Sequence, residues 1–86
     1  MTPMIDLTKE INSKEDLVAF IYVLIEDYKT NSSTTWENNT ISSFLNGILG
    51  FIHDYEGFYL NSGEVPPPNM TWRLLAETLV AARTYE

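Results

Sequence analysis

The chain has 86 residues, enough for one small domain with a single modest core. Apolar residues make up 44% of the sequence, which excludes a disordered acidic tail although the net charge is −7. Because an acidic folded surface repels phosphate backbones, we expect no direct binding of nucleic acid and a preference for partners with a basic surface.

The chain contains no cysteine, which excludes a disulfide framework, a thiolate metal site and a catalytic thiol. Its longest apolar run, Leu17 to Ile25, has nine residues. A membrane span needs about 20. We therefore expect a protein of the cytoplasm that neither crosses nor binds a membrane.

The first twelve residues form a lead-in arm, for which a short strand, a turn of helix or an extended segment over the core all remain possible. The first clear helix is predicted over residues 14–29. Ser13 is a good N-cap residue, and Glu15 and Asp16 place negative charge in the first turn. Apolar residues occupy most of its circumference, which places this helix at the centre of the fold. Residues 30–35 are all Ser, Thr or Asn and predict a polar loop.

A second helix is predicted over residues 40–55, capped by one of the polar residues at 38–40. Trp36 precedes the cap, and we expect it to pack against the first turns of this helix. Gly47 and Gly50 lower its helix propensity, which indicates either close approach of another backbone or a gap for a ligand.

Residues 56–69 predict a long loop, because two glycines and three consecutive prolines interrupt the helical pattern. The last helix is predicted over residues 70–85, with Asn69 or Thr71 as its cap and with Arg73, Glu77 and Arg83 facing solvent. These elements together predict a single all-α domain over residues 1–86, a small three- to four-helix bundle.

Three short motifs resemble those of a small uncharacterised bacterial family of unknown function. They are Trp36-Glu37-Asn38-Asn39-Thr40, then Asp54 to Tyr59 followed by Asn61, Gly63 and Glu64, and finally Trp72 with Ala76-Glu77. The resemblance covers residues 13–86 and implies a compact, mainly helical bacterial protein. It brings no reaction, ligand or catalytic residue with it.

The chain is also similar, more loosely, to the small acidic four-helix immunity proteins that neutralise bacterial nuclease toxins. The likeness lies in size, charge and an aromatic segment in which Asp54 precedes Phe58 and Tyr59. The spacing of the motif differs from theirs, so the likeness is an analogy between folds and charges.

Charge is distributed unevenly along the chain. Residues 31–70 contain four acidic residues and no Lys or Arg, whereas residues 71–86 are balanced. Aromatic and acidic side chains in this middle segment form the mixture from which interfaces with basic proteins are built. The alternative is that the aromatic residues pack in the core and the acids are ordinary surface. The predicted protein-binding residues are Trp36, Glu37, Asp54, Tyr55, Glu56, Phe58, Tyr59 and Glu64.

Support for catalysis or a metal is weaker. His53 is the single histidine, and His53, Asp54 and Glu56 are the most plausible site for a metal or small ligand. A single histidine with two neighbouring carboxylates holds a metal poorly, so we expect no cofactor, no metal and no enzymatic activity. The sequence favours a non-enzymatic acidic binding module, and most specifically an inhibitor or immunity-type protein that masks a basic surface of a bacterial toxin or nucleic-acid-acting protein. The alternatives are an oligomerising helical module, such as a homodimer, and a small-ligand or metal-binding protein near His53.

Overall fold

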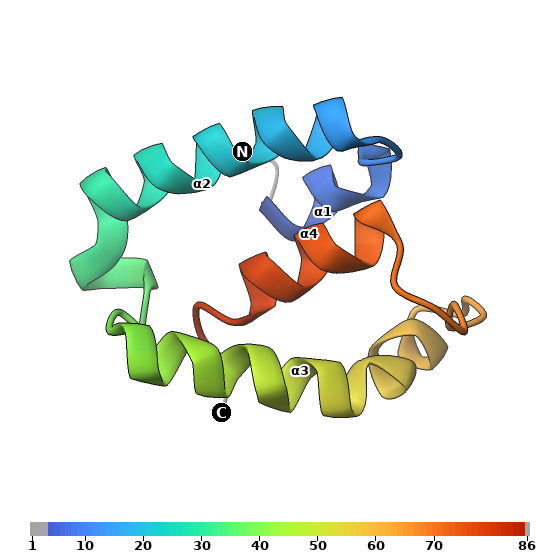
Figure 1. The fold of residues 1–86 in the computed structure, drawn as a ribbon. Helices are drawn as coiled ribbons and strands as arrows, with labels where there is room; N and C mark the ends of the chain where they lie inside the picture. Colours follow the sequence, from blue (N-terminus) through green and yellow to red (C-terminus); the bar gives the residue numbers. More distant parts are fainter. Residues whose placement is uncertain (1–3, 86) are drawn as a thin grey trace.

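The computed structural model of the chain describes residues 4–85 and is built from four α-helices. They are α1 (Met4–Leu7), α2 (Lys14–Thr35), α3 (Ile41–Asn61) and α4 (Trp72–Ala81), with a short 3-10 helix, η1 (Thr8–Glu10), after α1. The described residues contain no strand, so the prediction of a small all-α bundle is confirmed (Figure 1).

Each of the three long helices begins at a side-chain cap. Ser13, Thr40 and Thr71 are the N-cap residues, and each accepts a hydrogen bond from the backbone N–H three residues later. At Thr40 the contact is reciprocal, because Ser43 also accepts a bond from the Thr40 backbone N–H at 3.2 Å. The starts of these helices are therefore set by local sequence.

Helix α2 continues to Thr35, so the prediction of a polar loop over residues 30–35 is wrong. The hydroxyl groups of Thr30 and Thr35 donate to backbone carbonyls four residues earlier, and the Asn31 amide donates to Asp27 at 3.0 Å. These side chains find their partners inside the helix, so they do not compete with its backbone hydrogen bonds.

Helix α3 also runs further than predicted, to Asn61 rather than residue 55. Gly57 lies inside the helix, where the packing of its aromatic neighbours outweighs a propensity cost of about 1 kcal/mol. Gly63 lies two residues beyond the end of the helix, and its φ of 75° is a left-handed conformation that favours glycine. The irregular connection is therefore residues 62–71, shorter than the predicted loop over 56–69.

Two other predicted elements differ in extent. The last helix spans Trp72–Ala81 rather than residues 70–85, and turns follow it to Thr84. In the lead-in, residues 4–10 are helical as α1 and η1, and residues 1–3 lie outside the described part.

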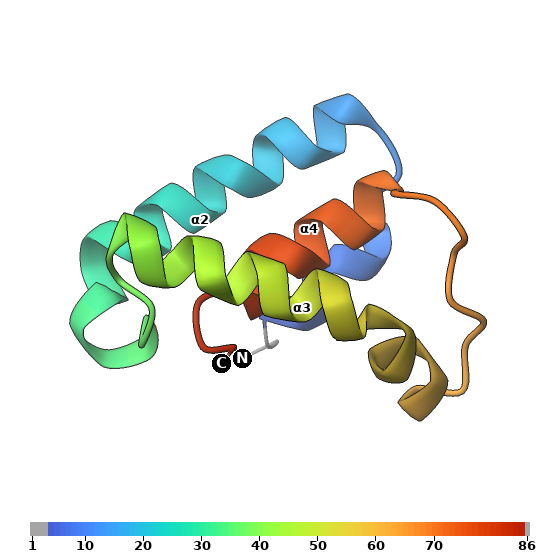
Figure 2. The ribbon, with the colours of Figure 1, turned by 60° about the horizontal axis from the view of Figure 1, so that its bottom comes forward.

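The central helix is α4, not the first predicted helix. It packs against α2, α3, η1 and α1, and it lies between α2 and α3 in both views (Figures 1 and 2). Half of its residues are buried, including Ala76 and Glu77. Helix α2 is too long and too exposed along one side to have neighbours all round, and its apolar circumference reflects an uncovered face.

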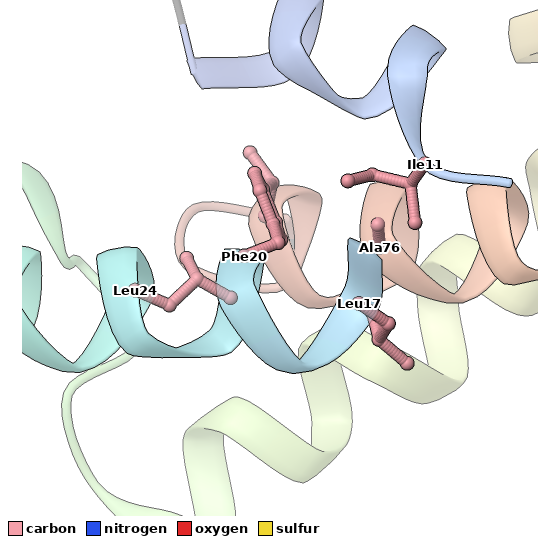
Figure 3. Close-up of a cluster of buried hydrophobic side chains, with 6 residues drawn as sticks. Ile11, Leu17, Phe20, Leu24 and Ala76 are labelled. Carbon is pink, nitrogen blue, oxygen red and sulfur yellow. The ribbon is translucent and has the colours of Figure 1, made fainter. Parts of the chain in front are cut away.

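The buried side chains form two clusters around α4. The first joins the residue after η1 and helix α2 to α4, and it contains Ile11, Leu17, Phe20, Leu24, Ala76 and Val80 (Figure 3). The second joins α3 to α4 and contains Phe51, Tyr59 and Leu74. Helices α2 and α3 are thus both held by α4.

Gly47 allows α3 to approach the end of α4 closely. A Cβ atom at this position would lie 2.5 Å from the carbonyl oxygen of Ala82 and 3.0 Å from the amide nitrogen of Asn38. Backbone approach, rather than a gap for a ligand, therefore explains this glycine.

Candidate functional site

The predicted binding residues fall into two groups at opposite ends of α3. Trp36 and Glu37 precede its first turn, whereas the others lie in its second half or just beyond. The rise of an α-helix separates Phe44, against which Trp36 stacks, from Phe58 by about 20 Å along the axis. The structure does not bring the eight residues together as one patch.

Trp36 holds the ends of α2 and α3 together. Its ring stacks on Phe44 with centroids 5.6 Å apart, and its indole N–H donates to the Asp27 carboxylate at 2.7 Å. Arg83 donates to the same carboxylate at 3.0 Å. Burial opposes the charge of Asp27, but hydrogen bonds from Trp36, Asn31 and Arg83 lower the pKa of its carboxyl below the ordinary value. Trp36 is half-buried, and Glu37 beside it is exposed.

Tyr59 and Glu64 belong to a polar network that fixes the connection 62–71 to α4. The buried Tyr59 hydroxyl donates to Glu77, which is 1% exposed. Arg73 donates to Glu77 at 3.2 Å and to both carboxylate oxygens of Glu64 at 3.0 and 2.9 Å. The prediction that Arg73, Glu77 and Arg83 face solvent is therefore wrong, because Glu77 is buried and the arginine side chains, 23% and 17% exposed, pair with Glu77 and Asp27. The (i, i+4) ion pair of Arg73 and Glu77 is the one the spacing predicts.

The other aromatic residues of the predicted binding set also have internal partners. Phe58 packs against Phe51 with ring centroids 5.4 Å apart, and the Tyr55 hydroxyl donates to the Pro67 carbonyl at 2.7 Å. Tyr55 lies on α3 as predicted, whereas Phe58 and Tyr59 lie on α3 rather than in the loop predicted over residues 56–69. Glu37, Asp54 and Glu56 are the exposed members of the predicted set.

His53 lies on the exposed side of α3. Its Nδ1 atom is 2.8 Å from Asp54, whose other oxygen accepts a bond from the Tyr85 hydroxyl at 2.6 Å. The hydrogen bond to Asp54 raises the pKa of His53, and the bonds from Tyr85 and His53 lower the pKa of Asp54. Over residues 4–85, no cluster of three or more His, Asp or Glu side chains is placed to hold a metal ion.

An apolar groove with a volume of about 710 Å³ lies between α2 and α3. Its walls and floor are mainly aliphatic and aromatic, and the side chains that shape it are Ile21, Ile25, Tyr28, Ile41, Phe44, Leu45 and Leu79. We call this surface the α2–α3 groove. Residues 36–40, which connect the two helices, close one end of it.

Large apolar side chains stand exposed at the mouth of the α2–α3 groove. Ile41 is 82% exposed and Leu45 is 57% exposed, and no charged residue occurs in α3 from Ile41 to Ile52. The groove is lined by α2, α3 and α4 and by no residue of α1 or η1, which pack elsewhere on α4. It is therefore a side of α4 that no other element of the described chain covers.

Sequence reasoning missed the α2–α3 groove, although a signal for it was present. The apolar residues of α2 and of the first half of α3 exceed what one buried stripe needs. By periodicity alone, the excess on α2 predicts burial on several sides. An exposed apolar face gives the same pattern, and only the packing of the helices separates the two.

The fold and this surface define a small all-α protein with an uncovered apolar groove. A family model for a family of unknown function, DUF7660, matches residues 13–86, and the chain belongs to this family. The predicted resemblance to a domain of unknown function is thereby confirmed. No curated protein and no solved structure matches the chain. Among the described helices, none has the length and apolar character that a membrane crossing requires.

Proposed function

We propose that this chain is a non-enzymatic protein-binding module whose α2–α3 groove receives an apolar helix of a partner protein. The observation that carries the proposal is the groove itself, about 710 Å³ in volume and bordered by two long helices. Grooves of this kind accept the apolar face of an amphipathic helix, because such a helix presents bulky side chains at intervals of three and four residues.

The shape of the bundle supports a helical occupant. Helix α4 already packs against α2, α3 and α1, and a partner helix over Leu79 would give it a further neighbour. It would also cover Ile41 and Leu45, whose exposure is costly in water.

Charge supports a partner with a basic surface. The chain has a net charge of −7, and Glu37, Asp54 and Glu56 stand exposed at or beside α3. These carboxylates would speed the encounter with a basic protein, whereas the groove would supply the apolar contact. A bacterial toxin or another nucleic-acid-acting protein fits this description, and the chain would then act as its inhibitor. The absence of cysteine from the sequence agrees with a role in the cytoplasm.

The test compares proteins that co-purify with three forms of the chain from its native cells, by quantitative mass spectrometry. The groove variant carries Ile41→Ser and Leu45→Ser. The matched control carries Leu60→Ser and Val65→Ser, two similarly exposed apolar residues that do not line the groove.

A partner should be recovered with the wild type and with the control, and lost with the groove variant. The association rate of the purified pair should fall as salt is raised from 50 to 500 mM, by about tenfold or more. Equal recovery with the groove variant would refute the groove as the docking site. A rate independent of salt would refute the electrostatic part alone.

A further inference from the structure

Helix α2 also carries a stripe of exposed side chains, which runs beside the wall of the α2–α3 groove. The stripe consists of Glu15, Val18, Tyr22, Ile25 and Lys29, and we call it the outer stripe. Steps of three and four residues place all five on one face of the helix. The three apolar members are exposed, with Tyr22 the most exposed at 67%, and they lie between an acidic and a basic residue.

The outer stripe is complementary to itself in the antiparallel direction. Glu15 and Lys29 each lie seven residues from Tyr22, which is about 10.5 Å along the axis in either direction. If two copies of α2 pair about a two-fold axis near Tyr22, Glu15 of each copy lies opposite Lys29 of the other. Val18 and Ile25 then meet across the same axis, because they lie at similar distances on either side of Tyr22.

The present partner of Lys29 does not compete strongly with such a pairing. Lys29 forms an ion pair with Glu26 at 3.6 Å, and both side chains are exposed. Exposed pairs of this kind contribute between zero and about 1 kcal/mol. Lys29 is therefore free to exchange Glu26 for a carboxylate on a second copy.

We propose that a second copy of this chain covers the outer stripe, in a two-fold symmetric and antiparallel α2–α2 dimer. This inference goes beyond the proposed function, which concerns a different protein in the groove. Ile25 and Lys29 lie at the edge shared by the outer stripe and the groove, so the second copy's helix lies along the outer lip of the groove. The dimer leaves the α3 wall, with Ile41 and Leu45, uncovered.

The size of the contact sets the expected strength. A standard interface covers about 800 Å² of each partner, which is about one seventh of the 5702 Å² surface of this chain. A single helix–helix seam of 15 residues is smaller. The −7 charge of each copy opposes association at long range, although ions at 150 mM salt screen it beyond about 8 Å. We therefore expect a dissociation constant on the order of 10–100 μM.

The test is a charge exchange measured by sedimentation equilibrium of the full chain at 20–500 μM. Glu15→Lys and Lys29→Glu each convert two attractive contacts per dimer into repulsive ones, and each should weaken association by about tenfold or more. The double variant, Glu15→Lys with Lys29→Glu, restores both pairs with their signs exchanged. It should return the dissociation constant to within about threefold of the wild type.

Glu10→Lys is the matched control, since it alters an exposed acid on η1 and changes the net charge as much as Glu15→Lys does. It should leave association unchanged or slightly stronger, because it lowers the general repulsion. Circular dichroism of each variant checks the fold, and the double variant separates lost pairing from lost helix stability.

A wild-type chain that remains monomeric up to 500 μM would overturn the dimer. So would a double variant as weak as the single ones, or equal weakening by Glu10→Lys. The α2–α2 dimer would also be overturned if Ile41→Ser with Leu45→Ser dissociated the dimer while the Glu15 and Lys29 variants left its dissociation constant unchanged. The chain would then self-associate through the α2–α3 groove. None of these results depends on the recovery of a foreign partner.

Discussion

Removal of the Arg73 side-chain charge should strongly destabilise the fold. Glu77 is 1% exposed, and its carboxylate is held by the Arg73 guanidinium at 3.2 Å and by the Tyr59 hydroxyl. Arg73→Met keeps much of the apolar stem but leaves a buried carboxylate without its cation. Breaking a buried pair in this way costs about 3 kcal/mol or somewhat more.

That cost is large for a chain of this size. A domain of 86 residues has a free energy of unfolding of about 4–13 kcal/mol. At about 4–8 °C per kcal/mol, the midpoint of thermal unfolding should fall by roughly 12–24 °C. The assay is urea unfolding followed by circular dichroism, with the slope against urea checked for a two-state transition.

A second substitution tests whether the buried charge of Glu77 causes the loss of stability. Glu77→Gln removes the buried charge, and the Gln carbonyl can still accept the bond from Tyr59. In the Arg73→Met background it should restore about 1–2 kcal/mol, although alone it destabilises. Glu64→Gln is the control, since it removes the outer partner of Arg73 and should cost less than about 1 kcal/mol. The reasoning is refuted if Arg73→Met costs under 1 kcal/mol, or if the double variant is no more stable than Arg73→Met.

Two other predictions follow from α3. Gly47→Ala should destabilise the fold by about 1–3 kcal/mol, because its Cβ would lie 2.5 Å from the Ala82 carbonyl oxygen. Gly57→Ala should stabilise the fold by up to about 1 kcal/mol, because nothing lies within 4 Å of the added atom. Equal effects of the two variants on the free energy of urea unfolding would contradict the close packing at Gly47. His53 should titrate by NMR with a pKa above the ordinary 6.5, and Asp54→Asn should lower it. The sign for stability follows from the raised pKa: while Asp54 is ionised, the His53–Asp54 contact contributes fully below pH 6.5, and its contribution is lost as pH rises through the raised pKa. An unchanged pKa in the variant would show that the two side chains do not interact.

Several features were predictable because they depend on neighbours in sequence. Ser13 is the predicted cap of its helix and Thr71 is one of the two predicted candidates for the last helix, since a hydroxyl group bonds a backbone N–H only three residues away. The same local view failed at residues 30–35, where a hydroxyl can either end a helix or bond to it. It failed again at Gly57, because local propensity does not include the packing of Phe58 and Tyr59.

For the candidate surfaces too, the sequence showed the composition, whereas burial and shape depended on tertiary contacts. The sequence identified the acidic and aromatic composition of residues 36–64, and the exposed acids Glu37, Asp54 and Glu56 belong to it. It could not show that Tyr59 is buried against Glu77, or that α2 and α3 leave a groove over α4. Both facts depend on contacts between residues far apart in the chain.

The sequence by itself determined the all-α class, the start of the first long helix at Ser13, and the −7 charge with its uneven distribution, because these follow from composition and from contacts within one turn of helix. Only the tertiary structure decided that α4 is the central helix and that the additional apolar residues of α2 form an exposed surface. Periodicity counts the apolar faces of a helix, but the number of faces that find a neighbour depends on how helices of 22, 21 and 10 residues pack together.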